Sequence, residues 1–148
     1  MEENVPNVAE SVTSNITSNV TPNHEFYDDI AGLHILLDDI YDECKEWGWD
    51  GYDAYPISES ALIYSHTFIE LIPDNIPMPI ISCEPSGDIT FEWYKKNDRT
   101  LIISVDNCGM ISYIWCMGKT IESGDVMVEG GEFPEKLIEM IKVIYDAQ

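Results

Sequence analysis

The chain has 148 residues, of which 45% are hydrophobic and 11% aromatic, and this is enough for one domain with a substantial core. It carries 28 acidic and 7 basic side chains, which give a formal net charge of −21. This charge excludes attraction to DNA, RNA or anionic membranes, because their phosphates would repel the protein. The partners we expect are cations or basic protein surfaces, although a strong negative charge also serves solubility alone.

Residues 1–22 are rich in Ser, Thr and Asn, and a near-repeat, TSNIT followed by SNVT, occupies positions 13–21. They contain no aromatic residue and no helical or strand period, which predicts a disordered tail. We expect residues 23–148 to form a single α+β domain. The N-terminus lacks the basic and apolar segments of a signal peptide, and no later run approaches the length of a membrane span. The sequence therefore predicts a cytoplasmic protein.

An apolar stripe with steps of three and four predicts a first helix of about 23 residues, capped near Thr21-Pro22-Asn23 and stopped by Gly48. The stripe consists of Phe26, Ile30, Leu33, Leu37, Ile40, Cys44 and Trp47. Acidic residues fall on the opposite face of this helix: Asp28, Asp39, Asp42, Glu43 and Glu46. Between residues 25 and 60 there are eleven acids and one base, so this region has the densest charge of the chain.

The stretch EWGWDGYDAYPISES, residues 46–60, joins the first helix to a second one. Ser58 is the expected cap of the second helix, whose buried side would consist of Ala61, Leu62, Ser65, Phe68, Ile69 and Ile72. Trp47 is expected to continue the apolar stripe, while Trp49 and Tyr52 cover the end of the core. This structural role is favoured over that of a ligand loop. Asp50 and Asp53 do not have the spacing of a calcium loop and join the candidate partner-binding acids.

After Pro73 the period changes to two, which is typical of strands. Strands are predicted near 89–94, 101–105 and 111–115, with a first strand at 79–83 and a less regular one at 125–129. The short connections between them indicate an antiparallel meander of four to five strands. A C-terminal helix begins at 133–135 and turns inward the side chains of Leu137, Ile138, Ile141 and Ile144. This order predicts an α+β fold with two N-terminal helices, and with helices packed on one face of the sheet.

Four short motifs carry a resemblance to known proteins. They are Trp49-Asp50-Gly51-Tyr52 with Ala54 and Pro56-Ile57-Ser58, then Glu92-Trp93-Tyr94, then Ile103-Ser104-Val105, and finally Tyr113 after a glycine turn. In this order they resemble a largely uncharacterised family of small bacterial and phage proteins, whose members typically read W-D-G-Y-x-A-x-P, then E-W-Y, then S-x-S/V. The resemblance covers residues 46–145. It implies a setting of mobile defence and toxin–antitoxin genes and implies little else about function.

No catalytic signature is found in the sequence. Ser65 and His66 are neighbours on a helix and cannot face each other, so they do not form a Ser-His dyad. The adjacent acids 28–29 and 38–39 lie on an exposed face, where both carboxylates stay ionised. Gly130-Gly131 precedes a helix but lacks the lysine of a phosphate-binding loop. We therefore predict a protein that is not an enzyme and that uses no cofactor.

The four cysteines are widely separated and form no C-x-x-C pair. In a reducing compartment Cys44, Cys83, Cys108 and Cys116 are expected to be small buried hydrophobic residues. A zinc site that combines them with His24, His34 or His66 is disfavoured, because no pair has ligand spacing.

These observations predict an acidic inhibitor of a basic, nucleic-acid-binding protein, such as an antitoxin, an anti-CRISPR or another anti-defence protein. Aspartates on successive helical turns lie roughly 5 Å apart along the axis, so they can imitate phosphates and occupy Lys and Arg side chains. The alternative is a soluble accessory domain that binds a protein through its exposed sheet, where Glu92 and Tyr94 point to solvent. In that case Glu92 either contacts the partner or pairs with Lys95, Lys96 or Arg99.

Overall fold

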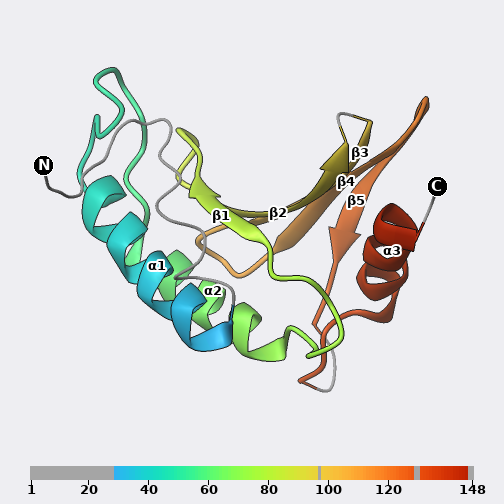
Figure 1. The fold of residues 1–148 in the computed structure, drawn as a ribbon. Coiled ribbons are helices and arrows are strands. Elements are labelled where there is room, and N and C mark those ends of the chain that lie inside the picture. The colour runs from blue at the N-terminus through green and yellow to red at the C-terminus, as the bar shows by residue number, and fades with distance from the viewer. Residues whose placement is uncertain (1–28, 97, 129–130, 147–148) are drawn as a thin grey trace, which may run out of the picture.

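The computed structural model describes residues 29–96, 98–128 and 131–146, which form an α+β structure of three helices and five strands (Figure 1). In chain order these are α1 (Ile30–Cys44), α2 (Glu59–Leu71), β1 (Ile80–Cys83), β2 (Ile89–Lys96), β3 (Arg99–Val105), β4 (Ile111–Met117), β5 (Thr120–Val126) and α3 (Glu135–Asp146). The predicted fold class is therefore confirmed. The predicted tail, residues 1–22, and the candidate site residue Asp28 lie outside the described residues.

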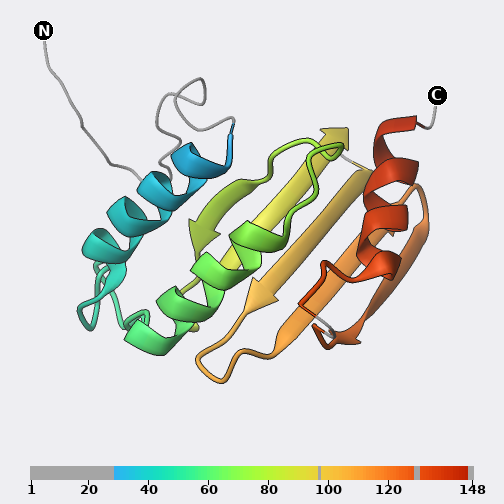
Figure 2. The ribbon, with the colours of Figure 1, turned by 90° about the horizontal axis from the view of Figure 1, so that it is seen from below.

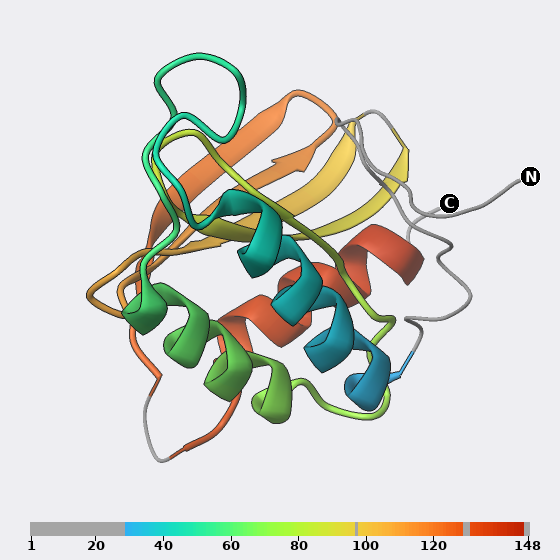
Figure 3. The same ribbon diagram turned by 90° about the vertical axis from the view of Figure 1, so that its left-hand side faces the viewer.

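The sheet is an antiparallel meander in which each strand pairs with the next one along the chain. Its register aligns Phe91 with Ile103 and Ile103 with Tyr113, and these residues share one face with Trp93 and Leu101. All five are buried. Figures 2 and 3 show why, since all three helices lie on that side of the sheet, with α2 and α3 packed on β2 and β3. The other face of the sheet is covered by no helix of the described structure.

Aromatic side chains join α2, the sheet and the segment before α3 into one core. The ring of Phe68 on α2 lies 4.8 Å from Phe91 of β2 and 5.1 Å from Phe133, between ring centroids. Trp93 is fully buried and satisfies its indole by donating a 2.7 Å hydrogen bond from Nε1 to the Pro77 carbonyl. Burial of each such side chain contributes about 1.5–3 kcal/mol, so this cluster fixes α2 and α3 against the sheet.

The first helix is shorter than predicted at both ends. It has 15 residues and begins at Ile30, where the Asp29 carboxylate accepts a 2.8 Å hydrogen bond from the Gly32 N–H as an N-cap. It ends at Cys44, because the Cys44 carbonyl accepts a hydrogen bond from the Ile57 N–H, 2.8 Å away, in place of the next helical donor. The predicted extension to Trp47 is therefore wrong, and the Trp47 side chain is 62% exposed.

The second helix and the C-terminal helix agree with the predictions. Ser58 caps α2, since its hydroxyl accepts a 3.0 Å hydrogen bond from the Ala61 N–H. The fifth strand differs, because β5 spans Thr120–Val126 and not the predicted 125–129. Among the described strands, β5 is an edge strand that pairs with β4 alone, and its Ile121 side chain is 71% exposed. The strand therefore lacks the alternation of buried apolar residues from which strands are predicted.

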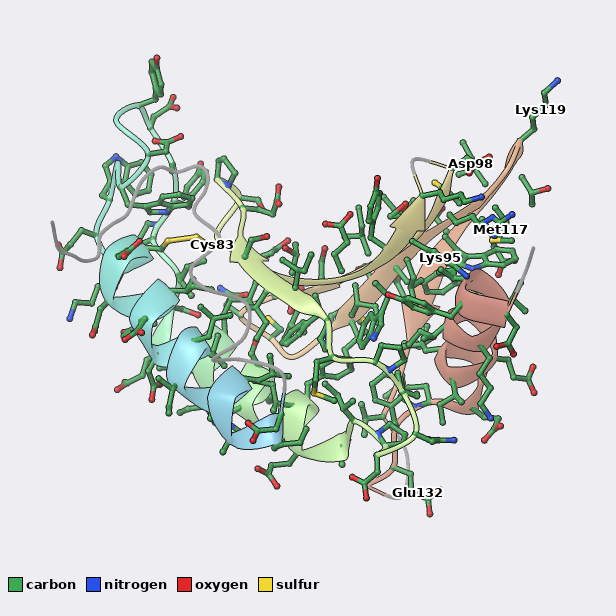
Figure 4. The ribbon with its side chains drawn as sticks, viewed as in Figure 1. Cys83, Lys95, Asp98, Met117, Lys119 and Glu132 are labelled. Carbon is green, nitrogen blue, oxygen red and sulfur yellow. A yellow bond between two sulfur atoms is a disulfide. The ribbon has the colours of Figure 1, made fainter. Side chains whose placement is uncertain are left out.

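Two cysteines do not behave as predicted. Cys44 at the end of α1 and Cys83 at the end of β1 are joined by a disulfide, which Figure 4 shows as a yellow bond beside the label of Cys83. The prediction of four separate buried thiols is wrong also for Cys108, which is a free thiol on the surface, while Cys116 is free and partly buried. The disulfide ties α1 to the edge of the sheet.

Candidate partner-binding surface

The exposed side of α1 carries the candidate acids Asp39, Asp42 and Glu43, as predicted. Partial burial raises the pKa of Asp39 above its ordinary value, and the charges of Asp42 and Asp38 raise it further. The pKa of Glu43 is likewise raised, by partial burial first and then by Asp39 and Asp42. These carboxylates therefore repel one another. An ion pair from Lys45 to Asp42 at 3.4 Å is exposed and weak.

The loop after α1 places the remaining candidate acids in different roles. Asp50 is a structural residue, since its Oδ1 accepts hydrogen bonds from the Tyr52 N–H at 2.9 Å and the Ala54 N–H at 3.2 Å. Glu46 lies beyond the end of α1, so it is not part of the helical row in which we expected it. Glu46 and Asp53 are exposed on the loop and extend the acidic surface of α1.

The aromatic residues of this loop divide between core and surface. Trp49 packs against the core and donates a 2.8 Å hydrogen bond from Nε1 to the Tyr55 carbonyl, which confirms its structural role. Tyr52 is 85% exposed, so the prediction that it covers the core is wrong. Trp47 and Tyr55 form an edge-to-face pair at 4.7 Å between centroids, and both are more than half exposed. The loop thus presents aromatic rings next to acids.

Glu92, another candidate, lies on the sheet face that no helix covers. Its cross-strand neighbours are Ile80 and Ile102, and partial burial among them raises the pKa of the Glu92 carboxyl. The Lys95 ammonium, one of the alternative partners considered for Glu92, donates a 3.0 Å hydrogen bond to the Tyr145 carbonyl. Tyr94 is 44% exposed on the same face.

Two more acids extend this second acidic group along the hairpin between β1 and β2. The pKa of Glu84 is raised by partial burial and then by the charges of Asp88 and Glu92. The pKa of Asp88 is raised by partial burial and by Asp106, while a hydrogen bond from Ser86 opposes the shift. Glu84, Asp88 and Glu92 therefore form a crowded acidic group, like the acids on α1.

The bases gather elsewhere. Of the seven Lys and Arg residues, four belong to the hairpin tips that join β2 to β3 and β4 to β5: Lys95, Lys96, Arg99 and Lys119. Two more, Lys136 and Lys142, lie on α3, and only Lys45 belongs to the acidic segment. Figure 4 shows Lys95 and Lys119 at the end of the sheet opposite to Cys83 and α1. The fold thus separates an acidic side from a basic end.

The sequence reasoning considered His34, His66 and Asp38 separately and missed the cluster that they form with Glu70 between α1 and α2. His34 and Asp38 stand one turn apart on α1, and His66 and Glu70 stand one turn apart on α2. The ring nitrogens of the two histidines are in hydrogen-bond contact. The signal was present as two H-x-x-x-acid patterns on helices expected to be neighbours. Within the described residues no group of three or more His, Cys, Asp or Glu side chains has the arrangement of a metal site.

Comparisons with protein-family models, with curated proteins and with solved structures find no match for this chain. The resemblance to the family of small bacterial and phage proteins therefore stays a prediction. None of the described helices is long and apolar enough to cross a lipid bilayer.

Proposed function

We propose that the protein is an inhibitor that binds a basic, nucleic-acid-binding protein through the acidic side formed by α1 and the following loop. The observation that supports this most directly is the crowding of Asp39, Asp42 and Glu43 on the exposed side of α1, where partial burial and then the neighbouring carboxylate charges raise the pKa values of Asp39 and Glu43. Such crowding costs stability in the free protein. A basic partner would relieve this repulsion, because its cations would pair with the carboxylates of α1.

The surroundings of this helix strengthen the proposal. Between residues 29 and 60 the chain carries nine acids and one base, Lys45: the acids are Asp29, Asp38, Asp39, Asp42, Glu43, Glu46, Asp50, Asp53 and Glu59. The exposed rings of Trp47, Tyr52 and Tyr55 lie in the same segment. Aromatic faces next to carboxylates favour Arg side chains, which stack on the ring while they pair with the acid.

Inhibition follows from competition for the same cations. A protein that binds nucleic acid places Lys and Arg along a groove, and each phosphate contact releases counterions. Carboxylates on successive helical turns repeat at roughly 5 Å, so a row on α1 occupies several of these cations at once. An antitoxin or an anti-defence protein would act in this way.

The test compares two variants that lose the same charge from different helices. The triple variant Asp39→Asn/Asp42→Asn/Glu43→Gln neutralises the face of α1, and Glu132→Gln/Glu135→Gln/Glu139→Gln is the control on and next to α3. Partners captured by the unmodified protein from host extract are purified, and the association and dissociation rates are measured at several salt concentrations. We expect the α1 variant to bind tenfold or more weakly, through slower association, and the control to bind nearly as well as the unmodified protein.

A second readout addresses inhibition itself. The purified partner is mixed with labelled duplex or single-stranded nucleic acid, and the unmodified protein should displace it, whereas the α1 variant should not. Equal losses in both variants would mean that only net charge matters. A captured partner without a basic groove would refute the proposal.

The uncovered sheet face supports a second candidate function, that of a protein-interaction domain whose charge is incidental. On that face Ile114 of β4 is 48% exposed and Ile121 of β5 is 71% exposed, and the same face carries Tyr94 on β2. Binding there would survive both charge variants and high salt. It would be lost on Ile114→Lys, which therefore distinguishes the two surfaces.

A further inference from the structure

Two histidines and two carboxylates form a continuous hydrogen-bonded chain between α1 and α2. His34 Nδ1 and His66 Nδ1 lie 2.7 Å apart, and the two ring centroids are 4.9 Å apart with planes at 23° to each other. The outer nitrogens are also occupied, since His34 Nε2 lies 2.5 Å from Glu70 Oε2 and His66 Nε2 lies 2.8 Å from Asp38 Oδ1. Each histidine thus reaches across to the carboxylate of the other helix.

The hydrogen bonds decide how many protons the two rings hold. An ionised carboxylate only accepts hydrogen bonds, so Nε2 of His34 and Nε2 of His66 must both carry a proton. Between the Nδ1 atoms one nitrogen must donate and the other must accept. The three contacts are therefore satisfied together by one imidazolium and one neutral imidazole, which share a proton between their Nδ1 atoms.

The other two protonation states each break a contact. If both rings are neutral, each ring carries one proton. The ring that donates from Nδ1 then has an unprotonated Nε2, whose lone pair faces a carboxylate. If both rings are charged, two N–H groups face each other across 2.7 Å, and the rings must move apart. Both losses weaken the connection between α1 and α2, since all three hydrogen bonds cross between the helices.

The groups around the pair are acidic or apolar. Asp38 and Glu70 face the rings directly, and the α1 residues next along, Asp39 and Asp42, are acids as well. Neither α1 nor α2 contains a Lys or Arg, and β1, which packs against α1, contains no charged residue. The strands under α2 present their apolar face to it, while Glu92 points to the opposite side. The rings are partly shielded from water, with 26% and 28% of the side chains exposed.

We propose that His34 and His66 bind one shared proton at the α1–α2 interface, and that the two helices are held in their observed contact by this singly protonated state. The contact then depends on pH in both directions. It is tightest while the pair holds one shared proton, and it weakens on loss of that proton or on gain of a second one. Because α1 carries the acidic surface, the pair connects the position of that surface to pH.

Nitrogen NMR of protein labelled with ¹⁵N histidine tests the proposal on the whole chain and needs no partner. In the singly protonated state we expect both Nε2 atoms to be protonated and both Nδ1 atoms to show shifts intermediate between a protonated and an unprotonated nitrogen. The rings should leave this state at two coupled steps as the pH is raised or lowered. Two histidines that titrate independently, each with an ordinary neutral tautomer, would overturn the proposal.

Matched carboxylate variants test the chain itself. Asp38→Asn and Glu70→Gln should each lower the pH at which the shared proton is lost, because the amide no longer requires a protonated Nε2. Asp39→Asn removes the same charge from the same helix without touching a ring, and should shift that pH less. An equal shift in Asp38→Asn and Asp39→Asn would overturn the hydrogen-bonded chain in favour of a general field effect. Since the readout is proton binding, the result does not depend on the proposed inhibition.

Discussion

Neutralising Asp39 should stabilise the protein, although it removes a charge from an exposed helix. The carboxylate of Asp39 is disfavoured in the folded state by partial burial and by Asp42 and Asp38, which raise its pKa. Asn has a helix propensity similar to that of Asp, so Asp39→Asn changes the charge and little else.

The size of the effect follows from the positions on α1. Asp42 and Glu43 stand three and four residues after Asp39, at the spacings where helical side chains meet. A like-charge pair at such a spacing costs about 0.2–0.5 kcal/mol, so removing two pairs returns about 0.4–1 kcal/mol. For a domain of this size the midpoint of thermal unfolding, Tm, should rise by about 1–4 °C.

The pH dependence has a definite sign. An acid whose pKa is raised by folding binds its proton more tightly in the folded state, so its protonation stabilises the fold. The free energy of unfolding therefore falls as the pH rises through the raised pKa values of Asp39, Glu43, Glu84, Asp88 and Glu92. The advantage of Asp39→Asn should be complete above the folded-state pKa of Asp39 and should vanish below its ordinary value.

Calorimetry of purified Asp39→Asn from neutral to mildly acidic pH measures the rise in Tm and its dependence on pH. Glu122→Gln is the control. The Glu122 carboxylate accepts a 2.8 Å hydrogen bond from the Lys136 ammonium and a 2.7 Å hydrogen bond from the Tyr113 hydroxyl. Both hydrogen bonds lower the pKa of Glu122. Glu122→Gln removes the same charge as Asp39→Asn, but it should lower Tm at neutral pH. If Asp39→Asn also lowers Tm, the crowding of α1 is not a source of strain and this reasoning fails.

Two further predictions concern the end of α1 and the loop after it. Trp49→Phe removes the indole hydrogen bond to the Tyr55 carbonyl and should lower the free energy of unfolding, measured in urea, by about 1 kcal/mol. An unchanged urea midpoint would show that this hydrogen bond does not order the loop. Cys44→Ser/Cys83→Ser opens a loop of 39 residues, which in the chain-entropy model costs about 4 kcal/mol. Melting with and without reductant checks this, since equal Tm values would show that the disulfide does not contribute.

The sequence predicted the elements of the fold because their signals are local. The apolar steps of three and four around Phe68, the cap at Ser58 and the alternation of Phe91 and Trp93 each lie within a few residues, as do the short turns that impose a meander. The acids of α1 were also found in this way, since the exposed side of a helix follows from its apolar stripe.

The tertiary structure decided what depends on residues far apart in the chain. The end of α1 is set by the hydrogen bond from Ile57 to Cys44, and the partner of Cys44 is a cysteine 39 residues away. The shared-proton pair joins His34 and His66 across 32 positions. Local periodicity places each of these groups on a helix face or a strand, but only the packing of α1 against α2 and β1 brings them within bonding distance of one another.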